Sequence, residues 1–314
     1  MKKLSKFTLL VMLVLAAVML CVACGGGETT DPTKAPATQA PTAIPTQEPA
    51  KTATPEPTAT PEPTATPDPA VVPAPFFDLK VEGDTVVDGT DNGYIEVMGG
   101  TVGEYTYKHE GKEIKLTTYQ GVEAGDWLSV LFEDLYSWEE MINESGIAFE
   151  ALFQLEKQTT SNSPIFGNGN GGGFGLMFRG ANAWPNINFG SYDNSASEFV
   201  AANYAYAIDP NAGEPIEVGV VHHVIAMLDI EERMVKFYLD GELLGEGEFG
   251  DGDFTVGSGK HNEVGIGGNV NIPGENLVAG SGGSYGIISA KIYDRALNEV
   301  QVQKAYEAAM ELLK

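Results

Sequence analysis

The chain has 314 residues, and its 18 Lys and Arg against 44 Asp and Glu give a formal net charge of −26. A surface this acidic excludes binding of nucleic acid through its phosphates, and it suits a neutral glycan, a cationic partner, divalent cations or simply the solubility of an exported protein. The two cysteines, Cys21 and Cys24, both lie near the N-terminus, which excludes disulfides, thiolate metal sites and a Cys nucleophile from the rest of the chain.

The first residues read as an export signal. The basic stretch "MKKLSKF" precedes the apolar run "TLLVMLVLAAVMLCVA", which is too short and too close to the terminus for a permanent spanning helix. Small residues then lead to Cys24, and Cys21-Val22-Ala23-Cys24 resembles a bacterial lipoprotein signal. The resemblance implies removal of residues 1–23, a lipid on Cys24 and a place on the outer face of the cytoplasmic membrane. An ordinary secretory signal is the alternative, and it also implies export.

Residues 24–75 predict a disordered Pro/Thr-rich linker. Thirteen of the 18 prolines fall between 25 and 75, and a six-residue repeat reads "TATPEP", "TATPEP" and "TATPDP" from positions 52, 58 and 64. Without periodic apolar residues no core can form. Proline at this spacing favours extended polyproline II, which would give a reach on the order of 150 Å. We therefore expect a stalk that holds a domain away from the membrane, or a neutral spacer.

Residues 76–314 predict one all-β domain. Gly, Asn and Asp divide this part into short β-branched and aromatic segments, a pattern typical of a sandwich or barrel. In "AFEALFQLE", residues 149, 151, 153 and 155 share one face of the strand, and 150, 152, 154 and 156 share the other. In "VKFYLDGELLGE", Asp240-Gly241 predicts a type I′ hairpin turn.

Two helices are expected beside the strands. "LYSWEEMINESG" predicts a short helix over 135–146 that ends at Gly146. At the C-terminus, Asn298 is a good N-cap and Gln301 completes a capping box. Val302, Ala305, Ala309 and Leu313 then follow at helical spacing, which predicts an amphipathic helix packed on the sandwich or at its rim.

An early loop is a candidate cation site. Asp88, Asp91 and Asn92 in "DGTDNG" supply hard oxygen ligands of the kind that calcium prefers. A turn rich in Asx residues is the competing interpretation. Calcium is thus the one cofactor that the sequence suggests, and the sequence does not establish that any cofactor binds.

Three motif matches fail on structural context. "HEGKE" at 109–113 opens like a zinc-protease motif, but Glu113 replaces the second histidine, and His222 and His223 alternate across a strand and cannot chelate together. Gly282 to Gly286 matches G-x-S-x-G, but a strand follows where the nucleophile elbow needs a helix. Gly167 to Gly172 matches G-x-G-x-x-G, yet a strand again follows, so a hairpin loop is expected.

Two stretches are candidates for contact with sugar. Asn168 and Asn170 lie in the Gly/Asn-rich loop, which we expect at a rim of the sandwich. In "NAWPNINFGSY", Trp184 and Tyr192 offer rings that stack on sugar faces, and Asn186 and Asn188 offer amides that read hydroxyls in two directions. A core position for Trp184 is the alternative.

The closing stretch carries a family resemblance. His223-Val224, the hairpin "YLDG" at 238–241, "VGIG" at 264–267 and "GIISAKIYDRAL" at 286–297 follow one another in an order and spacing that resemble the laminin-G-like branch of the concanavalin A-like lectin and glucanase superfamily. The resemblance implies a jelly-roll sandwich of two antiparallel sheets with a short C-terminal helix covering one end. It also implies that Tyr293 is an anchor and that Arg295 is free to pair with a carboxylate.

The resemblance also guides the functional expectation. The β-glucanases of the superfamily carry their carboxylates as E-x-D-x-E or E-x-D-x-x-E on one strand, and neither pattern occurs in this chain. We therefore expect a membrane-anchored extracellular module, not an enzyme, that binds carbohydrate or another extracellular polymer. A protein–protein adhesion or scaffold module is the alternative, and a glycoside hydrolase is a third.

Overall fold

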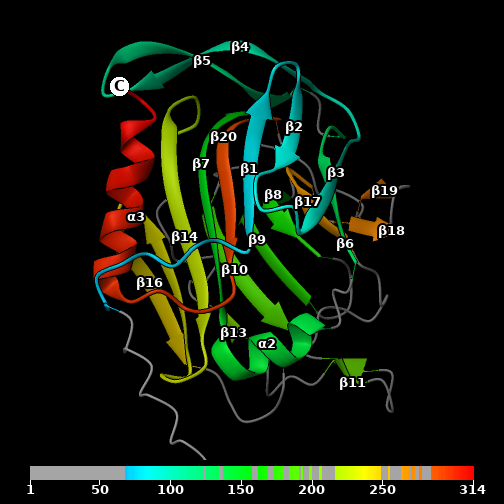
Figure 1. The fold of residues 1–314 in the computed structure, drawn as a ribbon, viewed down its shortest axis with the longest axis vertical. Coiled ribbons are helices and arrows are strands. Elements are labelled where there is room, and N and C mark those ends of the chain that lie inside the picture. The colour runs from blue at the N-terminus through cyan, green and yellow to red at the C-terminus, as the bar shows by residue number, and fades with distance from the viewer. Residues whose placement is uncertain are drawn as a thin grey trace, which may run out of the picture. The chain divides into compact units, whose positions relative to one another are not determined.

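The computed structural model describes much of the chain from residue 68 onwards (Figure 1). The described ranges are 68–122, 125–133, 137–157, 162–168, 173–179, 184–190, 192–193, 198–199, 205–206, 216–248, 254, 263–268, 270–272, 276–277 and 284–314. No helix within these ranges is long and apolar enough to cross a membrane.

Within the described ranges, most secondary structure is β-strand. The strands are β1 (Phe77–Glu82), β2 (Thr85–Asp88), β3 (Gly93–Val97), β4 (Thr101–His109), β5 (Lys112–Gly121), β6 (Leu128–Phe132), β7 (Ile147–Lys157), β8 (Asn162–Gly167), β9 (Gly173–Arg179), β10 (Trp184–Gly190), β11 (Tyr192–Asp193), β12 (Glu198–Phe199), β13 (Ala205–Tyr206), β14 (Val221–Asp229), β15 (Met234–Leu239), β16 (Glu242–Glu248), β17 (Glu263–Ile266), β18 (Val270–Ile272), β19 (Asn276–Leu277) and β20 (Ser284–Tyr293). The helices are α2 (Ser137–Ser145) and α3 (Glu299–Glu311).

Two antiparallel sheets pack face to face. One has the order β16-β15-β14-β7-β20-β1-β2, and β5 joins the β4–β5 hairpin to β20. The other has the order β13-β10-β9-β8-β17-β6-β3. The main core lies between them, where Phe149 of β7 and Phe174 of β9 place their ring centroids 4.6 Å apart. This arrangement confirms the predicted all-β sandwich of two antiparallel sheets.

Several local predictions are confirmed. Asp240 and Gly241 have φ angles of 51° and 83°, which are the two positive values that a type I′ turn needs. Asn298 caps α3, and both bonds of the capping box with Gln301 are formed. Helix α2 ends before Gly146, close to the expected boundary.

The position of α3 confirms that the helix packs on the sandwich, and it corrects the expectation that the helix covers one end. Its buried residues Val302, Ala305 and Ala309 instead pack on the outer face of the first sheet, over β7 and β14 (Figure 1). The reason is that this outer face is itself apolar: Ala148 and Leu152 of β7 point away from the main core and need a cover. Strand β7 is therefore buried on both faces.

The hairpin of β4 and β5, which we call the arm, covers the rest of that outer face. It is absent from the elements we expected. The arm leaves the sheet where β5 pairs with β20, and its tip reaches the C-terminal part of α3 (Figure 1). Tyr105, Tyr107, Ile114 and Leu116 of the arm pack with Leu152, Val221 and Ala309. The tip thus lies beside the helix because both elements cover one apolar surface.

The last residues of the expected linker lie against α3. The side-chain amide of Asn298 donates to the carbonyl of Pro69 at 2.9 Å, and that of Gln301 donates to the carbonyl of Val71 at 2.9 Å. Val72 packs on the cluster under the helix. The chain therefore makes contact with the domain before position 76, because the capping residues keep amide donors that the helix itself does not use.

Candidate functional site

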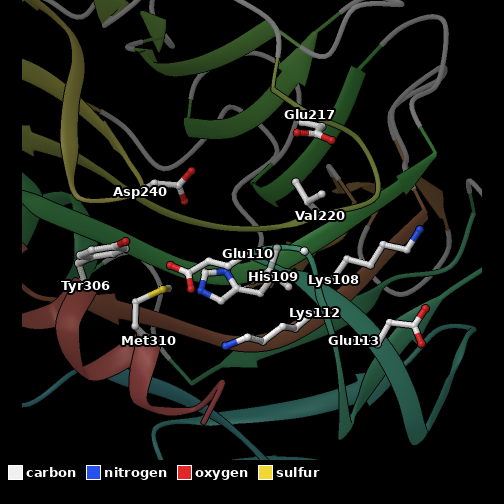
Figure 2. A pocket seen from close by; sticks show the side chains of 12 residues that line it. Lys108, His109, Glu110, Lys112, Glu113, Glu217, Val220, Asp240, Tyr306 and Met310 are labelled. Atoms are coloured by element: carbon white, nitrogen blue, oxygen red, sulfur yellow. The ribbon is translucent and has the colours of Figure 1, made fainter.

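A pocket forms where the arm tip meets α3, and we call it the arm pocket (Figure 2). Its volume is about 610 Å³, which is within the range of small-molecule sites. Four segments far apart in sequence build it: the arm tip, the approach to β14, the β15–β16 turn and the C-terminal half of α3. The lining residues are Lys108, His109, Glu110, Gly111, Lys112, Glu113, Glu217, Val220, Val221, Asp240, Tyr306 and Met310.

The arm tip is fixed over the sheet. Glu110 and Gly111 have φ angles of 49° and 74°, so a two-residue turn closes the hairpin directly after His109 pairs with Lys112. The backbone N–H of Lys108 donates to the side-chain oxygen of Gln154 on β7 at 2.9 Å. The wall of the pocket is thereby tied to the central strand of the sandwich.

Asp240 presents a carboxylate whose orientation is set by its neighbours. One oxygen accepts the backbone N–H of His223 at 2.8 Å, and the other lies 2.8 Å from Nδ1 of His222. The Nε2 of His222 lies 3.0 Å from the carbonyl of Glu217. Because a carboxylate and a carbonyl only accept hydrogen bonds, the doubly protonated imidazolium satisfies both contacts.

The electrostatics of His222 agree with this geometry. Burial alone would lower the pKa of His222, but the hydrogen bond and negative charge of Asp240, together with the Glu217 carbonyl and its side chain, raise it above the usual value. The Asp240 carboxylate in the pocket wall is therefore paired with a buried, protonated His222 ring.

Tyr306 supplies the aromatic wall. Its ring rests on the β15–β16 turn so closely that a β-carbon added at Gly241 would stand 2.8 Å from its Cδ1, and its centroid lies 5.5 Å from that of His223. Partial burial raises the pKa of the Tyr306 hydroxyl, and the negative charges of Asp240, Glu110 and Glu242 raise it further. The ring is thus held in place next to several carboxylates.

The arm pocket combines hydrogen-bonding groups of both kinds with an apolar surface. Four carboxylates and two lysine ammonium groups line it, with His109 beside them, while the Tyr306 ring and the Met310 side chain supply apolar area. The charged groups can accept hydrogen bonds from sugar hydroxyl groups and donate hydrogen bonds to them. The apolar groups can stack against the face of a sugar ring.

A buried polar cluster lies under α3. The Glu150 carboxylate is fully buried and accepts from Lys291 Nζ at 2.9 Å and from the Tyr293 hydroxyl, and His223 Nε2 is 3.4 Å away. Burial would raise the pKa of Glu150, but His223, Lys291 and Tyr293 together lower it to about 2. Tyr293 is thus an anchor at the end of β20, as the resemblance implies. Arg295 pairs with the adjacent Asp294 at 2.8 Å.

The predicted cation loop uses its carboxylate internally. The two oxygens of Asp88 accept backbone N–H groups from Asp78, Thr90, Asn92 and Gly93 at 2.8 to 3.0 Å, together with the Thr90 hydroxyl. The Asn92 amide donates to the Phe76 carbonyl, and Asp91 has a φ of 62°. Donors directed at Asp88 leave it few lone pairs for a cation, which favours the Asx-turn interpretation. In the described ranges, no three His, Cys, Asp or Glu side chains are grouped to hold a metal.

The predicted sugar contacts of the second sheet are only partly described. In β10, positions 184, 186 and 188 stand opposite Arg179, Met177 and Gly175 of β9, and Tyr192 begins β11. Phe174, Leu176 and Phe178 of β9 point into the main core, and their backbone partners in β10 are positions 189, 187 and 185. The contact of Asn186 and Asn188 with sugar stays a prediction. Asn170 and the lipid-attachment residue Cys24 lie outside the described residues.

Asn168 lies in the interior and not at a rim exposed to ligand. Its side chain is fully buried and donates to the carbonyl of Glu263 at 2.8 Å. The loop does connect β8 to β9 as an antiparallel hairpin, as expected. Ser284 of the G-x-S-x-G match opens strand β20, and its hydroxyl donates to the Gly121 carbonyl at 3.0 Å.

The residues of the arm pocket were not among the predicted sites. One signal was available: "VGEYTYKH" and "KEIKLTTY" alternate polar with apolar residues around Glu110-Gly111, which is the pattern of a hairpin. The approach of this tip to Tyr306 has no signal in the sequence, because nearly two hundred positions separate them.

Comparison with solved structures finds similarity to receptor-binding domains of botulinum neurotoxins. The receptor-binding domain of botulinum neurotoxin type G is 10% identical, with a TM-score of 0.48 over 74% of this chain and 51% of that chain. The binding domain of botulinum neurotoxin DC, solved in complex with rat synaptotagmin II, is 11% identical, with a TM-score of 0.48 over 75% and 51%. This chain spans about half the length of these structures. No curated protein matches it.

A family model settles the relationship. The Laminin_G_3 model, described as the concanavalin A-like lectin/glucanases superfamily, matches residues 133–303, which is more than half of the chain. The match includes the region of the closing motifs and agrees with the two-sheet sandwich. The chain belongs to the Laminin_G_3 family of the concanavalin A-like lectin/glucanases superfamily.

Proposed function

We propose that this protein is a non-catalytic module that binds carbohydrate in the arm pocket. The observation that carries the proposal is the pairing of a fixed aromatic ring with an oriented carboxylate: Tyr306 rests on the turn that presents Asp240, inside a pocket of about 610 Å³. Sugar binding uses this combination, because the ring covers the C–H face while the carboxylate accepts from hydroxyl groups. The superfamily includes lectins, which agrees with the proposal.

Preorganisation supports binding at this pocket. Asp240 is held by two hydrogen bonds, and Lys108 ties the arm tip to Gln154, so a ligand need not order these parts of the wall. A site whose walls are already ordered loses less entropy when it binds. The absence of the glucanase carboxylate patterns from the sequence supports the non-catalytic part of the proposal.

We include lipid anchoring in the proposal. It rests on the signal-like segment that precedes Cys24 and on the Pro/Thr-rich stretch that follows it. Pro69 and Val71 are bound at the first turn of α3, whereas Tyr306 and Met310 reach the pocket from the later part of the helix. The tether would thus join the domain at one end of α3 while the pocket opens at the other. Mass spectrometry of the N-terminal peptide tests the lipid, and Cys24→Ser should release the protein from the membrane fraction.

A glycan array probed with the full-length chain in detergent tests the binding claim. The array should carry neutral, acidic and amino sugars, and it should be repeated with Tyr306→Ala and Trp184→Ala. Binding lost with Tyr306→Ala and kept with Trp184→Ala supports the arm pocket. The reverse result would place the site on β10, where the sequence predicts it. No binding to any glycan would overturn the proposal and direct the search to protein partners.

A further inference from the structure

We infer that the arm pocket selects glycans that carry a free, protonated amino group. This inference rests on the proposed function and specifies its ligand class. Its support has three parts: the carboxylates around the Tyr306 ring, the placement of the pocket's own cations, and the charge of the surrounding domain.

The first part is the environment of Tyr306. An ammonium group is attracted to the face of an aromatic ring, and nearby carboxylates add their own Coulombic attraction. Figure 2 shows Asp240 and Glu110 on the same side of the pocket as Tyr306. The ring packs on Gly241, directly between Asp240 and Glu242. A ligand cation beside this ring would therefore meet several carboxylates.

The second part is the placement of the cations that already line the pocket. Lys108 and Lys112 are exposed on the arm tip; in Figure 2 Lys108 extends away from Tyr306, whereas Lys112 extends toward the side of the pocket where Tyr306 and Met310 lie. His222 lies 2.8 Å from the Asp240 carboxylate and offsets its charge, although His222 is not among the residues that line the pocket. Four carboxylates against two lysines and the His222 imidazolium still leave an excess of negative charge at the pocket.

The third part acts at longer range. Residues 76–314 contain 13 Lys and Arg against 38 Asp and Glu, and the resulting field attracts cations and repels acidic glycans before contact is made. The ammonium group of an amino sugar is attracted by the negative field, by the carboxylates and by the ring at once. A neutral sugar uses only the ring and the hydrogen bonds, so the amine should add affinity at the same site.

A matched pair of ligands tests the inference. Oligomers of glucosamine and of N-acetylglucosamine of equal length differ only in whether the amine is free. Their affinities for the full-length chain should be measured by calorimetry, at a pH below the pKa of the sugar amine. We expect the free-amine oligomer to bind at least about tenfold more tightly, and the difference to shrink as salt is added.

Matched variants place the effect. Glu110→Gln should reduce the preference for the free amine several-fold, because it removes one carboxylate beside Tyr306. Glu96→Gln removes the same charge from exposed β3, on the other sheet, and should leave the preference unchanged. Tyr306→Phe keeps the ring and should retain binding, whereas Tyr306→Ala should lose it. Thermal melting of each variant establishes that it is folded.

The outcomes separate the inference from the proposed function. Equal affinity for the two oligomers, with both lost in Tyr306→Ala, would overturn the amine preference and keep the carbohydrate site. Free-amine binding that survives Tyr306→Ala, or that falls equally with Glu96→Gln and Glu110→Gln, would show diffuse attraction and overturn the inference. Failure of both oligomers and of the glycan array would overturn both. Tighter binding of a lysine oligopeptide than of the amino sugar would contradict a glycan ligand.

Discussion

The ring of Tyr107 on the arm lies against the backbone of Gly286 on β20: a β-carbon built at Gly286 would stand 2.5 Å from Cε1 of Tyr107. Tyr107 is almost fully buried, and its hydroxyl pairs with that of Thr118. The arm therefore lies as close to the sheet as it does because position 286 has no side chain.

Gly286→Ala tests this contact. The added methyl group must displace a buried ring, which costs about 1–3 kcal/mol of unfolding free energy. Urea unfolding followed by circular dichroism measures the loss. Gly125→Ala is the matched control, since nothing lies within 4 Å of a β-carbon there. Equal stability of the two variants would contradict the close packing of the arm.

The Glu150 cluster predicts a component of acid sensitivity. The pKa of Glu150 is lowered to about 2 from an ordinary value of 4.5, so its contribution is present above pH 4.5 and is lost as the pH falls toward 2. The shift corresponds to on the order of 3 kcal/mol. Glu150→Gln should destabilise the protein at neutral pH and flatten stability between these two pH values. An unchanged pH dependence in Glu150→Gln would refute the assignment.

The pair of His222 and Asp240 predicts the opposite dependence. Because the pKa of His222 is raised in the folded state, its contribution is fully present below its unfolded pKa and is lost as the pH rises through the folded value. NMR titration of the His222 ring should give a pKa above 6.5, and Asp240→Asn should lower it. A His222 pKa that does not respond to Asp240→Asn would contradict the contact.

The Asp88 loop gives a test that separates a structural turn from a cation site. Asp88→Ala leaves several backbone N–H groups without their acceptor, and each buried unsatisfied donor costs about 1–3 kcal/mol. We expect a large drop in melting temperature, with no change in the wild-type melting temperature on adding calcium or chelator. A calcium-dependent rise that is absent in Asp88→Ala would instead establish the cation site.

Local features of the fold could be predicted from the sequence because their causes are local. Asp240-Gly241 specifies a turn through two backbone angles, and Asn298 with Gln301 closes a capping box within four residues. The alternation of Phe149 and Phe153 likewise identifies the core face of β7. Each of these depends on neighbours along the chain.

The sheet face that α3 covers and the arm pocket could not be predicted, because both depend on which surfaces remain to be covered. Strand β7 buries Glu150 and Gln154 as well as its phenylalanines, and no spacing in the sequence shows that α3 and the arm share its outer face. Tyr306 and Glu110 line one pocket only because α3 and the arm both cover this face. The predicted contacts on β10 depend on local alternation, which identifies a shared face but not a binding partner.

Calorimetric titration of the best array glycan into the wild-type chain, Tyr306→Phe and Tyr306→Ala tests the carbohydrate site most directly. We expect Tyr306→Phe to stay within about threefold of the wild-type affinity, because the ring is kept. Tyr306→Ala should lose at least about tenfold, because the stacking surface is removed. Folded Tyr306→Ala protein that binds the glycan with wild-type affinity would contradict the claim that the arm pocket is the carbohydrate site.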